Sequence, residues 1–514
     1  MRPTTGNSLG QRTTPNTLRL RRIGIDTYQE PVIYMHRNCH VCRAEGFEAQ
    51  SRVQVANGER AIIATLNVLT AELLAPDEAG LSEAAWRHLG SREGDVVMLS
   101  HPPPVESLRH VRGKIHGRPL DDAAMNAVVR DIVAGRYSDI HLASFITACA
   151  SNGLSLDETV ALTRAMIGVG DRLEWGRVPV MDKHSVGGLP GNRTTLIVVP
   201  IVAACGLTMP KTSSRAITSP AGTADTMETL APVDLDAAAM RRVVEQEGAC
   251  IVWGGGAVRL SPADDILIRI ERPLDIDTEG QLVASVLSKK AAAGSTHVVI
   301  DIPVGLTAKV RSADAAASLA QRLSDIGRAV GLEVRAVASD GTQPVGRGIG
   351  PALEARDAIA ILRGEAAGPG DLRERALALA GHVLELGSAV PAGQGRSLAE
   401  TILGDGRAWR KFQAICVAQG GLREPTQAAY TQTVSAAFPG CISAIDNRRL
   451  ARVAKLAGAP TAPAAGLELF VRVGATVEKG QPLFTVHSET PGELAYALEF
   501  VRAQGDIVTV EPDA

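Results

Sequence analysis

The sequence contains no long uninterrupted hydrophobic run. None of its apolar stretches reaches the 18 or so residues of a membrane-spanning helix, so the 514-residue chain predicts no such helix. The first 22 residues mix Thr, Gly, Asn and Arg and lack the apolar core that a secretory signal requires. We therefore expect a flexible tail over residues 1–22 rather than a secretory signal.

The chain also has few cysteines and a small net charge. The seven cysteines are odd in number and most of them lie in apolar stretches, which is typical of reduced intracellular thiols rather than of a disulfide framework. The formal net charge of −3 gives no general attraction to nucleic acid or to an anionic membrane. We expect a cytoplasmic protein without nucleic-acid or membrane partners, in which a local site holds any anionic ligand.

Apolar residues, in contrast, are numerous enough for several cores. Hydrophobic residues make up 45% and charged residues 21% of the chain, the balance of a globular protein. At a usual domain size of roughly 100–200 residues, the length predicts three or four domains. We place a β-rich domain at 23–100, a helical domain at 105–177, an α/β domain at 178–425 and a C-terminal α+β domain at 431–514.

The helical domain is predicted from apolar residues at helical spacing and from glycines that end each segment. Ser155 and Glu158 have the spacing of a capping box, which supports a helix start there. The predicted helices cover residues 121–133, 139–150 and 155–167.

A glycine-rich segment at 183–195 carries the first chemical signal. Its sequence is Lys-His-Ser-Val-Gly-Gly-Leu-Pro-Gly-Asn-Arg-Thr-Thr. Glycines let backbone N–H groups approach an anion, Lys183 supplies charge, and Ser185 and Thr195 supply hydroxyl donors. A helix in the apolar run that follows would point its N-terminus at the same anion. The combination fits a phosphate site, but a Gly-rich turn alone is as often structural, so a second element is needed. The segment is not a Walker A loop, because no Lys-Ser or Lys-Thr follows its last glycine.

A second polar segment at 211–223 places many hydroxyl groups around Arg215. A solvated loop would explain Ser and Thr alone. Two loops with hydroxyls and cations that flank one apolar element are better explained by a shared anionic ligand.

Four motifs in order resemble the thymidine and pyrimidine-nucleoside phosphorylase family. They are Lys-His-Ser-x-Gly-Gly, Val-Ala-Ala-Cys-Gly at 202–206, Ser-x-Arg with Thr eight positions after the Arg, and Ala-Ser-Val-Leu-Ser-Lys-Lys at 284–290. The extra N-terminal domain resembles the longer subgroup that includes AMP phosphorylases. The resemblance implies a multidomain α/β fold, with a helical domain beside a mixed α/β domain. It also implies phosphorolysis of an N-glycosidic bond, no cofactor beyond phosphate as a substrate, and a homodimer or higher homo-oligomer.

The resemblance also implies roles for single residues. Ser285 and Lys289 match base-contacting positions, and their spacing of four places both on one helix face. Asp277 matches a proton donor to the base. Lys183 and His184 are further catalytic candidates, although a structural hydrogen bond explains His184 equally well. Positions matching the phosphate site are Lys183, Ser185, Thr195, Ser213 and Thr223. Positions matching nucleotide contacts are Gly188, Ser214, Arg215, Ala216, Ile217, Thr218, Ser219, Thr223, Ser285 and Lys309.

Two departures from the family leave the substrate open. Pyrimidine-specific members hold the base with a Tyr and an Arg, where this chain has Ile268 and either Ile270 or Glu271. Their His in the hydroxyl-rich loop corresponds to Ser219. Thymidine and a nucleoside 5′-monophosphate such as AMP therefore both remain candidate substrates.

Three other interpretations deserve comparison. A related phosphoribosyltransferase would carry a Gly-Thr-Gly-Gly-Asp loop and acidic magnesium ligands, which the Lys-His-Ser motif argues against. A non-catalytic nucleotide-binding regulator would have lost phosphate-binding or proton-donor residues, which are present. Cys39 and Cys42, with His36 and His40 nearby, form half of a zinc-site pattern, but no second Cys pair follows, so we predict no metal.

Overall fold

A computed structural model of the chain describes residues 16–189, 191–216, 219–276 and 278–512. Contacts divide it into two compact units. The first comprises the chain up to His116 together with Arg130–Thr147, and the second comprises Gly117–Val129 and Ala148 onward. Among the described residues, no helix is both long and apolar enough to cross a membrane.

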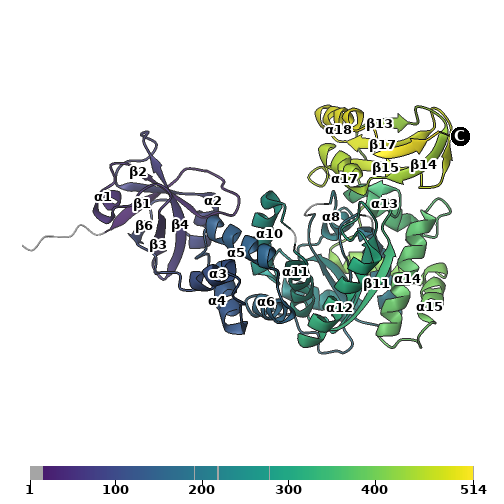
Figure 1. Cartoon of the computed structure of the whole chain (residues 1–514), viewed down its shortest axis with the longest axis horizontal. Coiled ribbons are helices and arrows are strands. Elements are labelled where there is room, and N and C mark those ends of the chain that lie inside the picture. The colour runs from purple at the N-terminus through teal and green to yellow at the C-terminus, as the bar shows by residue number, and fades with distance from the viewer. Residues whose placement is uncertain (1–15, 190, 217–218, 277, 513–514) are drawn as a thin grey trace, which may run out of the picture. The chain divides into compact units, whose positions relative to one another are not determined.

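The first unit contains a closed six-stranded barrel, drawn in purple in Figure 1, with strand order β1-β5-β2-β4-β3-β6. Its first strand corrects an expectation, because residues 17–22 were assigned to a flexible tail. Leu18 and Leu20 alternate with polar residues and are buried inside the barrel, so this segment is a strand. The elements are β1 (Thr17–Arg22), β2 (Val32–His36), α1 (His40–Glu45), β3 (Arg52–Asn57), β4 (Arg60–Leu69), β5 (Glu78–Leu81), α2 (Glu83–Leu89) and β6 (Val96–Ser100).

The predicted helices are confirmed. They are α4 (Asp122–Val133), α5 (Asp139–Asn152) and α6 (Leu156–Gly168), and a further helix, α3 (Leu108–Ile115), precedes them. The capping box is present: Ser155 Oγ accepts from the Glu158 N–H at 3.1 Å, and the Ser155 N–H donates to Glu158 Oε2 at 3.0 Å.

A parallel sheet organises the α/β domain. Its strands are β11 (Glu333–Asp340), β10 (His297–Val304) and β7 (Met181–Ser185), in that order. A second parallel pair, β8 (Met209–Ser213) and β9 (Ala249–Trp253), continues it through a parallel bridge between Val180 and Thr208. The carboxyl ends of β7 and β8 therefore meet at one edge, where ligands bind in open α/β sheets. Both polar segments start at this edge.

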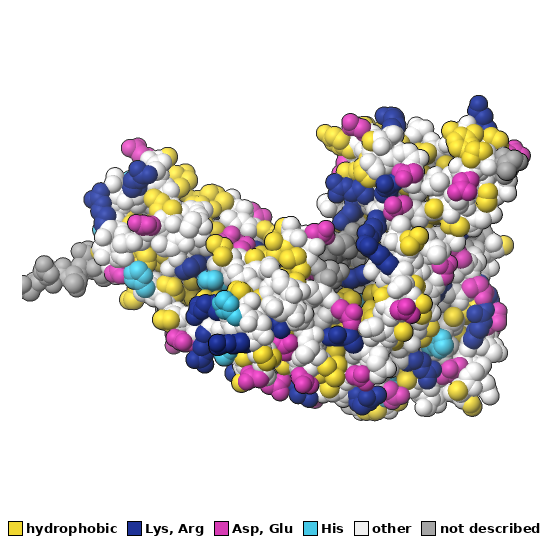
Figure 2. Space-filling view, in the orientation of Figure 1, with side chains coloured by type: hydrophobic (Ala, Val, Ile, Leu, Met, Phe, Trp, Pro, Cys, Tyr) yellow, Lys and Arg dark blue, Asp and Glu magenta, His cyan; other side chains and the backbone are white. Residues whose placement is uncertain are grey.

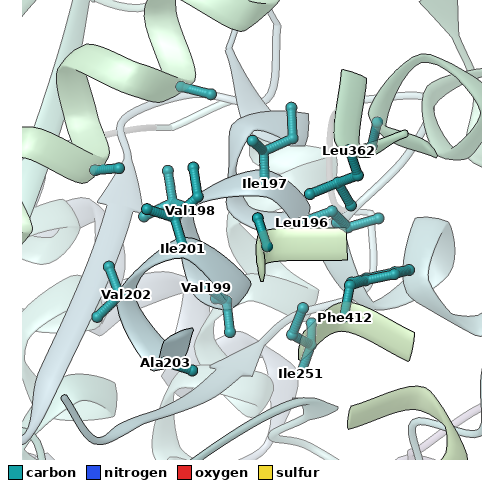
Figure 3. Packing of buried hydrophobic residues seen from close by; sticks show 14 of the residues in the cluster. Leu196, Ile197, Val198, Val199, Ile201, Val202, Ala203, Ile251, Leu362 and Phe412 are labelled. Carbon is teal, nitrogen blue, oxygen red and sulfur yellow. The ribbon is translucent and has the colours of Figure 1, made fainter. Parts of the chain in front are cut away.

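The helix α7 (Thr195–Ala204) is the apolar element between the two polar segments. It is hydrophobic on all sides and is buried, as a helix in the centre of a domain must be. Figure 3 shows its side chains packed against Ile251 of β9, Leu362 of α13 (Pro351–Leu362) and Phe412 of α16 (Arg407–Gln419). It begins at Thr195, the last residue of the glycine-rich segment, so the apolar run considered in the sequence is a helix whose N-terminus adjoins that segment.

The remaining elements of this domain are mostly helices. They are η1 (Asn192–Thr194), α8 (Thr223–Glu228), α9 (Ala237–Glu247), α10 (Pro262–Leu274), α11 (Glu279–Ala292), α12 (Ala313–Ala329), α13 (Pro351–Leu362), α14 (Gly370–Leu386), α15 (Gly395–Gly404) and α16 (Arg407–Gln419).

The C-terminal domain, coloured yellow in Figure 1, has one sheet of order β12-β15-β17-β13 and another of order β16-β14-β18. One of its strands comes from the α/β region, since Gly348 of β12 pairs with Glu468 of β15. This pairing joins the two domains through backbone hydrogen bonds. The elements are β12 (Gly348–Ile349), β13 (Tyr430–Ser435), β14 (Gly440–Ile445), α17 (Asn447–Leu456), β15 (Gly466–Leu469), β16 (Thr476–Val477), β17 (Pro482–Ser488), α18 (Pro491–Ala503) and β18 (Val508–Glu511).

Candidate active site

A cavity of about 660 Å³ lies at the sheet edge where the two polar segments begin. It belongs entirely to the second unit, and its size is typical of a small-molecule site. Figure 2 shows Lys and Arg side chains gathered along the hollow beside the C-terminal domain. The predicted site residues that line it are Lys183, His184, Ser185, Gly188, Thr195, Ser213, Ser214, Arg215, Ser219, Thr223, Ser285, Lys289 and Lys309.

Four predicted residues are not in this set. Ala216 does not line the cavity: its N–H donates to Asp225 Oδ2 at 2.6 Å and its carbonyl accepts from Arg272 at 3.1 Å. Ile217, Thr218 and Asp277 lie outside the described residues.

Lys183 occupies the buried end of the cavity. Its ammonium donates to Ser185 Oγ at 2.7 Å and to Thr194 Oγ1 at 2.5 Å. Burial lowers the pKa of Lys183 to about 8. An anion bound here would favour the protonated lysine, so the site is suited to a compact anion surrounded by hydroxyl groups.

Asp301 orients the serine of this group. Ser185 Oγ donates to Asp301 Oδ2 at 3.0 Å, and Ser339 Oγ donates to the other oxygen of the same carboxylate at 2.5 Å. Arg375 donates to Ser339 Oγ at 2.7 Å and completes the network. Sequence reasoning missed Asp301, although a fully buried carboxylate in the apolar strand β10 is itself a signal of a polar network.

Two of the loops approach each other so closely that one position requires glycine. A Cβ atom built on Gly188 would lie 2.1 Å from Cβ of Ser219. The glycine-rich segment and the hydroxyl-rich segment are therefore in direct contact, as their predicted shared ligand requires.

A buried ion cluster lies beneath the loops. Asp182 is 3.2 Å from the ammonium of Lys211 and 2.8 Å from that of Lys290. Burial opposes ionisation of Asp182, but the two lysines hold its pKa below the ordinary value. The pKa of His184 is well below 6.5 because of burial and of Lys290 and the other nearby lysines, so its imidazole is neutral near pH 7. His184 therefore contributes a neutral donor or acceptor to the cavity.

Arg215 is held by carboxylates. Its Nη2 donates to Glu228 Oε1 at 2.9 Å, its Nη1 lies 3.2 Å from Asp225, and the guanidinium stacks 4.7 Å from the ring of Trp253. The hydrogen bond to Glu228 raises the pKa of Arg215. Much of its charge is thus balanced within the protein, and the side chain fixes the shape of the loop.

Residues of α10 and α11 form another part of the cavity lining. Ser285 and Lys289 both line it from one face of α11, as their spacing predicts, and Lys289 Nζ lies 2.6 Å from Asp264. Asp265 also lines the cavity, where desolvation and the neighbouring Asp264 raise its pKa to about 6. Sequence reasoning missed Asp265, which follows a helix start without a distinguishing pattern.

The two residues that can correspond to the family's Arg have different surroundings. Glu271 lines the cavity together with Ile268, whereas Ile270 is buried in the core. The further cations that line the cavity include Arg272 of α10 and Lys455 of α17, which sequence reasoning missed. Lys455 lies nearly 200 positions further along the chain, which hides the relationship in the sequence.

Known families match along most of the chain. A helical bundle domain of a glycosyl transferase family matches residues 109–170, the α/β domain of that family matches 177–409, and a pyrimidine nucleoside phosphorylase C-terminal domain matches 441–507. A relative in Polaromonas sp. (strain JS666 / ATCC BAA-500), named "Putative thymidine phosphorylase", is 68% identical over 501 residues that cover 98% of each chain. The chain belongs to the thymidine phosphorylase family. The family and fold predictions are thus confirmed, and the chain is a glycosyltransferase of this family.

Other similar proteins carry the same printed name. In Acidovorax sp. (strain JS42), "Putative thymidine phosphorylase 2" is 66% identical and the match covers 96% of both chains. A Legionella pneumophila relative is 58% identical, over 98% of this chain and 97% of its own.

Among solved structures, a crystal structure of anthranilate phosphoribosyltransferase from Thermus thermophilus is 22% identical to this chain, with a TM-score of 0.49. The match covers 60% of this chain and 98% of that one.

Proposed function

We propose that this enzyme cleaves the N-glycosidic bond of a nucleoside or nucleotide with inorganic phosphate, releasing a free base and a pentose 1-phosphate. The observation that carries the proposal is the buried ammonium of Lys183, which is held by Ser185 and Thr194 at the N-terminus of α7. Such a group binds a compact anion in preference to a bulky cofactor. Thr195, Ser213 and Thr223 add hydroxyl groups to the lining of the same cavity.

Two groups of cavity residues suit the two halves of this reaction. A phosphate oxygen attacks the anomeric carbon while the bond from that carbon to the base nitrogen breaks. Positive charge grows on the sugar and negative charge on the base, so a phosphate close to the sugar and fixed donors close to the base lower the barrier. Lys183 and the hydroxyls hold the phosphate, whereas Ser285 and Lys289 contact the base. Asp277, matched through the family resemblance, is the first candidate for the acid that protonates the base, and Asp265, which lines the cavity, is the second.

Thymidine is the first candidate substrate. Its phosphorolysis yields thymine and 2-deoxyribose 1-phosphate, and the names of the relatives support it. A neutral nucleoside needs only the phosphate site and the base site described above.

A nucleoside 5′-monophosphate such as AMP is the second candidate, and a specific feature favours it. Lys455 and Arg272 line the cavity. The pKa of Lys455 is lowered mainly by burial, and also by the positive charges of Arg272 and Arg452. Such mutual repulsion marks a cluster of positive charge that a second anion would relieve. Ile268 and Glu271 also replace the donors that pyrimidine-specific members use. AMP would yield adenine and ribose 1,5-bisphosphate.

A base-release assay distinguishes these candidates. Thymidine, uridine and adenosine are each compared with their 5′-monophosphates, with and without inorganic phosphate. Phosphate-dependent release of base supports phosphorolysis. Release that occurs only with nucleotides, with a KM raised at least tenfold by Lys455→Ala and unchanged by Lys411→Ala, supports the second substrate. Base consumption with phosphoribosyl pyrophosphate and no phosphorolysis would identify a phosphoribosyltransferase, and no turnover at all would favour a regulator.

We further propose a homodimer or higher homo-oligomer in the cytoplasm, on the basis of the family resemblance. Light scattering coupled to size exclusion measures the mass directly. A mass equal to the 53.8 kDa of one chain would contradict the oligomer.

A further inference from the structure

The barrel of the first unit contains the only two cysteines of the sequence that are three positions apart, Cys39 and Cys42. Cys39 is the N-cap residue of α1, and Cys42 is the third residue of that helix. Side chains at these two positions face each other, as the Ser and Glu of a capping box do. Helix geometry places Cα atoms three residues apart at about 5 Å. That separation lies within the range that a disulfide spans.

The surroundings of the pair give its two thiols different pKa values. A hydrogen bond from the Cys42 thiol, assisted by the N–H groups of Cys42 and Val41, outweighs burial and lowers the pKa of Cys39 below the ordinary thiol value. Cys42 is the partner that keeps the proton. In contrast, burial raises the pKa of Cys250 and of Cys416 to about 12. Cys39 therefore ionises more readily than the other buried thiols, and the thiolate is the reactive form.

Access to the pair is limited to small molecules. Cys39 is completely buried and Cys42 is 7% exposed, and both pack into the barrel core beside Phe47. A bulky disulfide such as oxidised glutathione would have to displace this core. A peroxide is small enough to reach Cys39 through a local opening of the short helix α1.

We propose that Cys39 and Cys42 are a site of reversible oxidation, at which hydrogen peroxide converts the two thiols into an intramolecular disulfide. The Cys39 thiolate attacks one peroxide oxygen and the O–O bond breaks, giving a sulfenic acid on Cys39 and, after proton uptake, water. The Cys42 sulfur then attacks the sulfenic sulfur, the S–O bond breaks, and a second water leaves with the Cys42 proton. Two electrons pass from the thiols to the peroxide. A small dithiol reverses the change by thiol–disulfide exchange.

The other five cysteines provide internal comparisons. Cys205 and Cys441 are more exposed than the pair, and both are free thiols. Exposure alone would therefore predict that these two are oxidised first. Pairing and a lowered pKa predict instead that Cys39 and Cys42 react first and stop at the disulfide.

The test exposes the full-length reduced protein to increasing hydrogen peroxide, alkylates the remaining thiols under denaturing conditions, and maps each cysteine by mass spectrometry. We expect the segment with Cys39 and Cys42 to lose two hydrogens and to escape alkylation at peroxide levels that leave Cys250 and Cys416 alkylated. Dithiothreitol should restore both thiols. In Cys42→Ser, oxidation should stop at the sulfenic acid of Cys39, which a cyclic diketone traps. Cys149→Ser, which removes a single buried cysteine, is the matched control and should be oxidised like the unaltered protein.

Several results would overturn the proposal. These are a pair that stays reduced while Cys205 or Cys441 is oxidised, oxidation that passes directly to sulfinic acid, or one zinc ion per chain bound by the pair in the purified protein. If either serine variant fails to fold, the mapping of the unaltered protein decides the outcome alone.

Discussion

The ammonium of Lys183, at the end of β7, donates a 2.5 Å hydrogen bond to the hydroxyl of Thr194, eleven positions later in η1. The bond closes the glycine-rich segment into a loop and places the lysine beside the first turn of α7. Sequence reasoning assigned Thr195 to this site, and both threonines are buried there. The lysine is thus held in position before any ligand arrives.

Lys183→Ala should lower kcat/KM for phosphate by about 10²–10³-fold, because it removes a preorganised donor from the anion site. Any surviving activity should show a raised phosphate KM and a less affected nucleoside KM. Initial rates at varied phosphate test this, with Lys411→Ala as the matched control: Lys411 pairs with Glu247 at 2.9 Å and does not line the cavity. An unchanged phosphate KM in a folded Lys183→Ala enzyme would refute the role of this lysine.

The lowered pKa of Lys183 predicts how phosphate use depends on pH. Since burial brings this pKa to about 8 in the free enzyme, the charged form is lost as the pH rises through 8. We expect kcat/KM for phosphate to fall by up to tenfold per unit above that value. Lys183→Arg, whose guanidinium stays charged, should shift the decline to higher pH even if its maximal rate is lower. The same decline in both enzymes would assign it to another group.

Gly188→Ala should separate the two phosphate-side loops. The added methyl would lie 2.1 Å from Cβ of Ser219, so one loop must move, and small displacements of a binding loop cost large factors in rate. We expect at least a 10²-fold loss of kcat/KM.

Relief of the same contact provides the control. The double variant Gly188→Ala with Ser219→Gly removes the clashing atom and should regain more activity than Gly188→Ala alone shows. Gly404→Ala, which adds a methyl group into open space at the end of α15, should leave the rate unchanged. No recovery in the double variant would mean that the loops do not meet as described.

Arg193 links the phosphate loop to the C-terminal domain. Its guanidinium is buried, lies 3.5 Å from Glu354 and 3.6 Å from Asp357, and donates to the carbonyl of Gly348 in β12. Arg193→Met leaves the buried Glu354 without its counter-charge, which typically costs about 3–5 kcal/mol. We expect a lower Tm and a raised phosphate KM.

The loss should depend on pH with a definite sign. Burial raises the pKa of Glu354 to about 7 even beside Arg193, and removing the arginine raises it further. The variant is therefore destabilised most above pH 7, where the carboxylate is charged, and least near pH 5.5, where it is protonated. Thermal melts at both pH values test this, and Arg193→Met with Glu354→Leu should recover part of the Tm. A deficit that does not change with pH would exclude Glu354 as its source.

The sequence predicts this site well where neighbours in the chain make it. Lys183 with Ser185 and Ser285 with Lys289 are local spacings on a strand and a helix, and the structure brings both pairs to the cavity. It predicts poorly where distant segments meet. Asp301, on another strand, accepts the hydrogen bond of Ser185, and Lys455 reaches the cavity from the C-terminal domain. The strand β1 was missed because only two leucines in a polar segment mark its buried face.

The proton donor to the base remains a choice between two carboxyl groups, and one pair of variants decides it. Asp277, matched through the family resemblance, lies outside the described residues, while Asp265 lines the cavity with a pKa of about 6. A departing purine gains more from protonation than a pyrimidine held by charged donors. If Asp277 is the acid and the substrate is a purine nucleotide, Asp277→Asn should lower kcat by roughly 10²–10⁴-fold with little change in nucleotide KM. Asp265→Asn should then change kcat less than tenfold.

If Asp265 is the acid instead, the large loss of kcat should occur in Asp265→Asn. The unaltered enzyme should then lose rate as the pH rises through 6, because the Asp265 carboxyl loses its proton. Efficient thymidine turnover that neither variant impairs would show that the base leaves without a carboxylic acid.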